Sequence, residues 1–268
     1  MPPLPLHAPL TSPIADPNLF HSLAAKLLWV GRVARPDVLT NATQLANIAN
    51  PTGADARRAN NTLVSITDTP ITLHYPRLHP DSLRVDVFAD YSGSATSPLP
   101  RSELGYLIAL VDDTHRFSLL HWASHRPHRV CRGSCAGELL AVADAVAAAL
   151  DVRLLLQELL MRRVPMAAYT DSSAAYDLVT SFKDPTDMTG KNDLFMLRRS
   201  LLAGTIQDLA LVDGAHNPAD ALSKPTFARP APNPSLANAL RSGLLRPLIR
   251  CHTTSAANRD DPRRPART

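Results

Sequence analysis

The sequence predicts an α/β fold in which a five-stranded mixed sheet is flanked by helices and preceded by a small helical appendage. Three apolar runs of strand length follow one another before the first long helical segment, which indicates a meander. Two further runs then alternate with helical segments. With split helices counted once, the order is three strands, a helix, a strand, a helix, a strand and a helix. The chain of 268 residues is long enough for one ordinary domain plus a smaller unit.

Three helices are expected in the appendage, over residues 18–34, 36–50 and 52–68. Arg35-Pro36 and Asn50-Pro51 separate them, and Pro36 suits the first turn of a helix because no amide hydrogen is needed there. Residues 71–75 are expected to form a short strand or an extended link. Nothing in this part indicates chemistry, so we interpret it as a packing unit.

The main domain is expected over residues 83–228. Its strands are expected at residues 84–89, 106–111, 117–124, 166–170 and 206–212. Residues 112–115 are expected to form the hairpin turn between the second and third strands. Helices are expected from Ser134 to about Leu150 with a second piece to Met161, from Ser172, over residues 191–203, and from Pro218. Gly204 stands at a C-cap position, where glycine is favoured.

The ends of the chain differ from the domain in composition. The 24 prolines are concentrated at the ends and in connectors, so residues 1–17 are expected to be a disordered Pro-rich N-terminus and residues 229–268 a Pro/Arg-rich tail. No run reaches the length of a membrane span and the first residues lack a basic start, so we expect a soluble, intracellular protein with no membrane partner. The net charge of +4 suits a polyanionic partner. Cys131 and Cys135 do not have zinc-site spacing.

Four acidic residues are the candidates for a metal site. Asp90 and Asp171 each close an apolar run, Glu138 lies on the Ala/Leu-rich helix, and Asp220 lies in the last helical segment. Carboxylates from separate elements can converge to hold two hard divalent cations, an arrangement that hydrolyses phosphodiesters by in-line attack of water. Four carboxylates packed together repel, so their pKa values should be raised until cations enter.

Five short motifs occur in a fixed order along this domain. They are Phe88-Ala89-Asp90, Arg101-Ser102-Glu103-Leu104-Gly105-Tyr106, Trp122-Ala123-Ser124, Tyr169-Thr170-Asp171 and Ala219-Asp220-Ala221-Leu222-Ser223-Lys224-Pro225. Together they resemble the ribonuclease H (RNase H) domain of copia-type retrotransposons. The resemblance implies an RNase H-like fold and an endonuclease that hydrolyses the RNA strand of RNA/DNA hybrids.

The same resemblance implies roles for the four acids. Asp90, Glu138, Asp171 and Asp220 would be both the catalytic residues and the ligands of two Mg²⁺ ions, for which Mn²⁺ is a substitute. In the family, the counterpart of Asp90 bridges both ions, and the position matched by Asp220 holds the ion that activates water. No covalent intermediate is needed in this two-ion mechanism.

A second resemblance lies upstream of the domain. Residues 20–29 and 34–38 resemble segments that follow the palm of copia-type reverse transcriptases. This implies that residues 18–80 are a helical remnant of the thumb and connection, and that the chain is part of a larger retroelement polyprotein. No Tyr/Phe-x-Asp-Asp palm motif occurs, and Val111-Asp112-Asp113 is most simply a hairpin turn, so polymerase activity is not expected. Since residues 1–80 offer no matched catalytic group, they are expected to be dispensable for the chemistry but not for solubility.

Candidate substrate contacts are of two kinds. Three residues follow the aspartates that close strands, where amides and hydroxyls meet phosphate or the 2′-OH that distinguishes RNA: Ser92, Gly93 and Ser172. An N-cap is an equally good interpretation of Ser172. Three basic residues share one expected helix and suit a phosphate backbone, although a solvated helix face explains them nearly as well: Lys191, Arg198 and Arg199. His216, four residues before Asp220, is an auxiliary candidate, with a solvent-facing turn residue as the favoured interpretation.

Two departures from the copia pattern bear on activity. Asp90-Tyr91-Ser92-Gly93 lacks the second carboxylate and the tryptophan of the family, and Gly137 stands in the first turn of the helix that bears Glu138. They leave open a second hypothesis, a catalytically silent, decayed or domesticated module that binds nucleic acid. A third hypothesis, integrase-like strand transfer, is disfavoured because that chemistry usually uses three acids in a different order.

Overall fold

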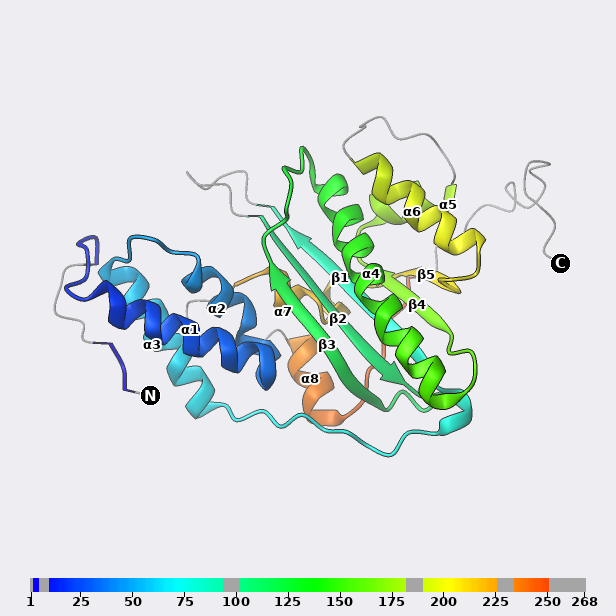
Figure 1. Cartoon of the computed structure of the whole chain (residues 1–268), viewed down its shortest axis with the longest axis horizontal. Coiled ribbons are helices and arrows are strands. Elements are labelled where there is room, and N and C mark those ends of the chain that lie inside the picture. Colours follow the sequence, from blue (N-terminus) through cyan, green and yellow to red (C-terminus); the bar gives the residue numbers. More distant parts are fainter. Residues whose placement is uncertain (1, 5–9, 94–101, 182–189, 226–233, 251–268) are drawn as a thin grey trace.

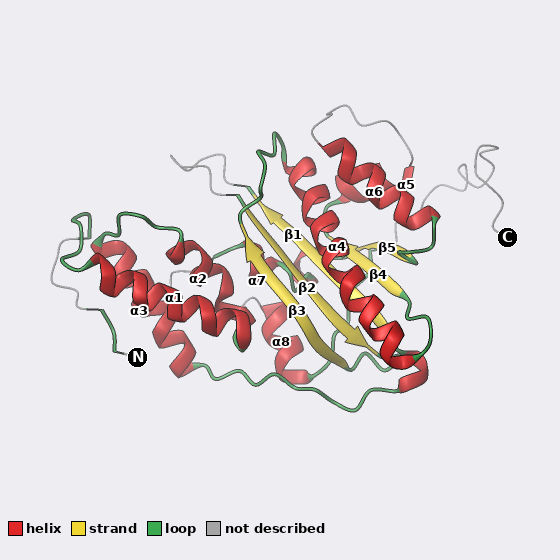
Figure 2. Ribbon diagram, in the orientation of Figure 1, coloured by secondary structure: helices red, strands yellow, loops and turns green. Residues whose placement is uncertain are grey.

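The computed structural model describes residues 2–4, 10–93, 102–181, 190–225 and 234–250. At its centre lies a five-stranded sheet made of β1 (Arg84–Ser92), β2 (Glu103–Val111), β3 (Phe117–His125), β4 (Met166–Thr170) and β5 (Asp208–Leu211), as Figures 1 and 2 show. The strand order is β3-β2-β1-β4-β5, in which β1, β2 and β3 pair antiparallel and β4 and β5 run parallel to β1. The expected mixed sheet is therefore confirmed.

Helices cover both faces of the sheet (Figure 1). One face carries α4 (Ser134–Leu160), α5 (Ser173–Ser181) and α6 (Lys191–Leu202), and the other carries α7 (Asp220–Ser223) and α8 (Pro234–Ser242). Side chains of β1 alternate between the two cores: Val85, Val87 and Ala89 pack with α4, whereas Phe88 packs with α7 and α8. Asp90 shares the face of Phe88, which directs it toward α7.

The long α4 helix is continuous, where two pieces were expected. Neither Gly nor Pro occurs between Gly137 and its last residue, Leu160, so no residue interrupts the ladder of i→i−4 hydrogen bonds. Met161 ends the helix in the left-handed conformation, with φ of 51°. Two local predictions are confirmed: β4 has the expected bounds, and Gly204 follows α6 with φ of 67°.

The N-terminal helices form a unit with its own core. They are α1 (Pro17–Val33), α2 (Leu39–Ala46) and α3 (Gly53–Asp68), and residues 36–38 form a 3-10 turn ahead of α2. Phe20, Leu27 and Leu45 are fully buried between these helices. The three expected helices are confirmed, and residues 71–75 are an extended link and not a strand.

The first residues differ from the disordered N-terminus that was expected. Leu4 is buried, its amide donates to Asn60 Oδ1 at 2.7 Å, and Asn60 Nδ2 donates to its carbonyl at 2.8 Å. The amide of Ile14 donates to the Pro51 carbonyl at 3.2 Å. Pro residues remove donors from this segment, but the remaining amides pair with α3 and the loop before it, so the described part of residues 1–17 is attached to the helical unit.

The predicted tail over residues 229–268 is also wrong in its described part. Residues 234–242 form α8, whose Leu236 and Leu240 are spaced by one helical turn and are buried against the sheet. Beyond α8, the amide of Leu245 donates to the His115 carbonyl at 2.8 Å. Residues 251–268 lie outside the described residues.

The helical unit lies along the β3 edge of the sheet (Figure 1). Trp122 Nε1, in β3, donates to the Gly31 carbonyl at 2.9 Å, and Thr43 Oγ1, in α2, donates to the Ser124 carbonyl at 3.2 Å. Polar contacts thus join the helical unit to the sheet. Of the helices that the structure describes, none combines the length and apolar content that crossing a membrane requires.

Candidate active site

Three of the four predicted acids converge at one end of the sheet. Asp90 lies in β1 and Asp171 directly follows β4, and these strands are parallel neighbours in which Phe88 pairs with Tyr169. Glu138 is in the second turn of α4, which crosses β1. One carboxylate oxygen from each of the three lies within 4.8 Å of the others. Parallel pairing of β1 and β4 brings the two aspartates to the same end of the sheet, and the start of α4 brings the glutamate there.

Gly137 and Tyr91 together bring the start of α4 against β1. A Cβ atom on Gly137 would lie 2.4 Å from ring atoms of Tyr91, so a larger residue there would displace the Tyr91 ring. The Tyr91 hydroxyl donates to Ser102 Oγ at 2.8 Å, and the Tyr91 amide donates to the Glu138 carboxylate. The glycine that departs from the copia pattern therefore accommodates the tyrosine that follows Asp90.

Asp220 lies beside the group of three and is joined to it by Lys224. The ammonium of Lys224 forms an ion pair with the Asp220 carboxylate and stands 3.7 Å from Asp90 Oδ2. Ser223, which is fully buried, donates its hydroxyl hydrogen to the same Asp90 oxygen. The short α7 helix and the residue after it thus supply three groups that act on the charge of this site.

A close approach between β2 and α7 makes these contacts possible. Gly105 pairs with Asp90 in the sheet, and a Cβ atom there would lie 2.4 Å from the Leu222 carbonyl carbon and 2.6 Å from the Ser223 amide nitrogen. Both atoms are backbone, so no side-chain rotation relieves the overlap. Fully buried Asn217 adds a second restraint, because its Nδ2 donates to the Ala89 carbonyl at 3.0 Å.

Gly105→Ala is therefore expected to lower the unfolding free energy by about 1–3 kcal/mol, because α7 must move away from β2. Urea unfolding measures this loss. Gly133→Ala is the matched control, since a Cβ there meets nothing within 4 Å and its backbone is extended. Equal stability of the two variants would contradict the close approach.

Burial and mutual repulsion shape the charge of the site. Burial, together with the charges of Asp171 and Asp220, raises the pKa of Asp90 to about 6, although the bond from Ser223 opposes the shift. Burial and the charges of Asp90 and Asp171 raise the pKa of Glu138 to about 9. Burial alone would lower the pKa of Lys224, but its hydrogen bond to Asp220 and the surrounding negative charges raise it.

The donor set fits a hard divalent cation. All candidate ligand atoms are carboxylate oxygens, the type that Mg²⁺ and Mn²⁺ take. Glu138 Oε2 is buried and has no hydrogen-bond partner among the described residues. A buried oxygen without a partner is costly. A cation between Asp90, Glu138 and Asp171 would relieve both this cost and the repulsion.

The order and directions of the strands now decide the fold. The chain has an RNase H-like fold. This assignment follows from a sheet of three antiparallel strands followed by two parallel ones, with α4 crossing the sheet and acids at one end. No protein-family model and no curated protein matches the chain.

Solved structures of RNase H proteins resemble the chain at low identity. RNase H1 from the halophilic archaeon Halobacterium salinarum NRC-1 is 21% identical, with 58% of this chain and 99% of that chain covered and a TM-score of 0.38. LC11-RNase H1, isolated from compost and solved in complex with an RNA/DNA hybrid, is 15% identical, with coverages of 52% and 94% and a TM-score of 0.39. The RNase H domain of prototype foamy virus is 14% identical, with coverages of 61% and 95% and a TM-score of 0.34.

The predicted contacts beside the aspartates have different surroundings. Ser92 ends β1 partly exposed, and Gly93 after it is exposed. Ser172 Oγ accepts a hydrogen bond from the Ala175 amide at 3.3 Å, the geometry of the N-cap that was its alternative interpretation. His216 is an exposed residue of the 3-10 turn over residues 214–216, in line with its favoured interpretation.

The three basic residues predicted to contact substrate from α6 differ in their exposure to solvent. Arg199 is exposed, and Lys191 is partly buried with its ammonium 5.4 Å from the ring centroid of Phe195. Arg198 is buried, and its Nη2 donates to the Leu178 carbonyl at 2.7 Å. A guanidinium that joins α6 to α5 from inside the domain does not face a phosphate backbone, so the structure does not support Arg198 as a substrate contact.

Sequence reasoning missed a basic loop, which we define as residues 126–132 between β3 and α4. His125 pairs with Leu104 beside Gly105, the partner of Asp90, so the loop begins at the end of the sheet where the acids lie. Exposed basic side chains occur along it: Arg126, His128, Arg129 and Arg132. The signal was visible as a basic run directly before the helix that bears Glu138.

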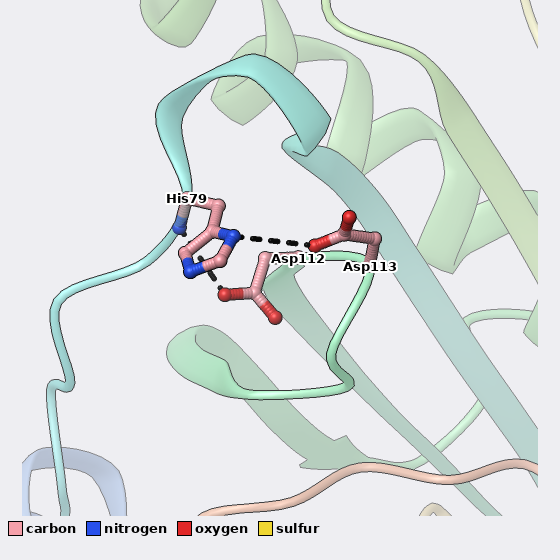
Figure 3. Close-up of side chains that lie close together, drawn as sticks. All are labelled: His79, Asp112 and Asp113. Atoms are coloured by element: carbon pink, nitrogen blue, oxygen red, sulfur yellow. Dashed lines mark hydrogen bonds and ion pairs between the residues drawn. The ribbon is translucent and has the colours of Figure 1, made fainter.

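A second cluster of possible ligands lies at the β2–β3 turn (Figure 3). Buried Asp112 accepts hydrogen bonds from the His79 amide at 3.2 Å, from Thr114 Oγ1 at 2.6 Å and from the Arg116 guanidinium at 2.9 Å. Burial acts to raise the pKa of Asp112, but these bonds outweigh it and hold that pKa well below its usual range. The oxygens of Asp112 are occupied in closing the turn, so the predicted hairpin is confirmed and the cluster is structural.

Proposed function

We propose that this protein is an endonuclease that hydrolyses the RNA strand of RNA/DNA hybrids with Mg²⁺. The observation that carries the proposal is the convergence of Asp90, Glu138 and Asp171, with a buried Glu138 oxygen that has no hydrogen-bond partner among the described residues. Such a group favours cation binding over an ordinary structural role. Asp220, joined to Asp90 through Lys224, is the fourth acid of the site.

When bound, divalent ions supply the positive charge that activates water and offsets the charge on the leaving 3′ oxygen. The protein contributes the positions of the carboxylates. Ser223 orients Asp90, and the Tyr91 amide orients Glu138. Lys224 cancels part of the negative charge, which lowers the repulsion that a substrate phosphate meets on approaching the acids.

The basic loop is the best candidate for the surface that holds the nucleic acid. Exposed Arg126 and Arg132 lie at the same end of the sheet as the acids, and phosphate contacts of this kind provide affinity without sequence preference. Lys191 and Arg199 on α6 extend the positive charge, whereas buried Arg198 does not. Ser92 and Gly93 remain candidates for reading the 2′-OH of the RNA strand.

We further propose that the chain belongs to a copia-type retrotransposon polyprotein. Support comes from motif residues outside the acids: Gly105 admits α7 beside β2, and Ser223 and Lys224 contact Asp90. A resemblance limited to acidic residues would leave these positions unexplained. No polymerase activity is proposed, since Asp112 and Asp113 stand in a hairpin turn.

Cleavage of a labelled RNA/DNA hybrid tests the function. With Mg²⁺ the full chain should cut the RNA strand of the hybrid and leave duplex DNA and duplex RNA intact, and chelation by EDTA should stop the reaction. Hybrid binding without cleavage in Mg²⁺ or Mn²⁺ would instead indicate a catalytically silent module. Equal cutting of duplex DNA would contradict the proposed substrate.

A further inference from the structure

The α7 helix is too short to hold its own shape. It spans residues 220–223, and its backbone bonds run from Leu222 to the Ala219 carbonyl at 2.8 Å and from Lys224 to the Asp220 carbonyl at 3.0 Å. Isolated helices of this length are unstable in water, because nucleation costs more than a few hydrogen bonds return. Its orientation, and with it those of Asp220 and Ser223, must come from tertiary contacts.

One of these contacts comes from the N-terminal helical unit. In a longer helix the Ala221 carbonyl would accept from the residue four positions later, but that residue is Pro225, which has no amide hydrogen. Thr40 Oγ1, in α2, donates to this carbonyl at 2.8 Å in a buried contact. Leu39, next to it, is buried in the same apolar cluster as Leu222.

The α2 helix is itself attached to the sheet by a separate contact. Thr43 Oγ1 donates to the Ser124 carbonyl of β3 at 3.2 Å, one helical turn after Thr40. The Trp122 indole bonds to the Gly31 carbonyl of α1. The helical unit therefore bridges the β3 edge and α7. It reaches the segment that carries the acid through the Thr40 hydroxyl, through Leu39 and through the turn of residues 36–38.

We infer that the N-terminal helical unit is a positioning element of the active site, in which the Thr40 hydroxyl holds α7 so that Ser223 contacts Asp90 and Asp220 lies beside it. The inference rests on the proposed function and is an alternative to the expectation that residues 1–80 are dispensable for the chemistry. Thr40 touches neither substrate nor metal. It acts through the Ala221 carbonyl on the charge and geometry of the acids.

Three single variants of the full chain test this inference with Mn²⁺ alone as the probe. Thr40→Val keeps the shape and removes the hydroxyl, Thr40→Ser keeps the hydroxyl, and Thr43→Val removes the neighbouring bond that does not reach α7. Calorimetric titration should show Mn²⁺ affinity about tenfold weaker in Thr40→Val, the loss expected for one buried hydrogen bond. Thr40→Ser and Thr43→Val should bind as the unaltered chain does.

Stability is measured beside metal binding, because a merely structural role would lower it without changing affinity. Unfolding in urea should show similar losses for Thr40→Val and Thr43→Val, so that only Mn²⁺ affinity separates them. If Thr40→Val does not fold, Thr40→Ala takes its place. Comparing Thr40→Ala with Thr40→Ser again compares a variant that lacks the hydroxyl with one that keeps it. Unchanged Mn²⁺ affinity in the variant without the hydroxyl would overturn the inference and leave the proposed nuclease intact. An unaltered chain that neither binds Mn²⁺ nor cuts hybrid would overturn both.

Discussion

Asp90→Asn and Asp171→Asn are each expected to lower hybrid cleavage on the order of 10³-fold, because each removes a carboxylate proposed to hold the divalent ions. The fold should survive both changes. Burial raises the pKa of Asp90 to about 6, so a neutral amide of the same shape is no less stable there than a buried carboxylate. Single-turnover cleavage of a labelled hybrid at saturating Mg²⁺ measures the activity, and urea unfolding measures the stability.

Asp177→Asn is the matched control for this comparison. Asp177 is an exposed acid on α5, the helix that follows Asp171, and its replacement removes the same charge a short distance along the chain. Its cleavage rate should equal that of the unaltered protein. Cleavage that persists in Asp90→Asn or Asp171→Asn at unchanged Mg²⁺ would refute the assignment of the metal site.

Without metal, the Glu138→Gln variant is expected to be more stable than the unaltered chain at alkaline pH. Burial raises the pKa of Glu138 to about 9 from an ordinary value near 4.5. A carboxyl with a raised folded pKa contributes stability below its unfolded pKa and loses it as pH rises through the folded pKa. Across this range the unaltered chain should therefore lose up to about 1.4 kcal/mol per pH unit more than the glutamine variant loses.

The pH range of the measurement separates Glu138 from Asp90. The pKa of Asp90 is raised only to about 6, so its contribution is already lost above pH 7, and the difference between the two proteins from about pH 7 to 8.5 reports Glu138. Thermal unfolding in EDTA at these two pH values gives the difference. Added Mg²⁺ should restore stability to the unaltered chain and much less to Glu138→Gln. A flat pH profile in both proteins would show that the Glu138 carboxyl is not held neutral.

Local signals in the sequence predicted most of the elements. The apolar run before Asp171 predicted the bounds of β4, and Gly204 marked the end of α6 because a left-handed residue there favours glycine. Elements that depend on distant partners were predicted poorly. The α8 helix was taken as part of a tail, because its Leu236 and Leu240 gain their apolar partners only when the sheet is formed.

The candidate site divides in the same way. Asp90, Glu138 and Asp171 were found from short motifs, because the strand ends and the helix that carry them are local features. Whether Arg198 faces solvent or the Leu178 carbonyl depends on how α6 packs on α5, and residue type does not reveal it. Whether the basic loop lies near the acids likewise depends on the end of the sheet at which it begins.

The sequence by itself determined which acidic residues are candidates for the site and the order of the strands and main helices that present them, since both follow from residue type and short-range periodicity. Only the tertiary structure decided what holds those residues in place. Gly105 admits α7 through a contact with Leu222, and Thr40 bonds to the Ala221 carbonyl across 181 positions of the chain. Such contacts leave no local pattern, because each partner is an ordinary residue until the fold brings the two together.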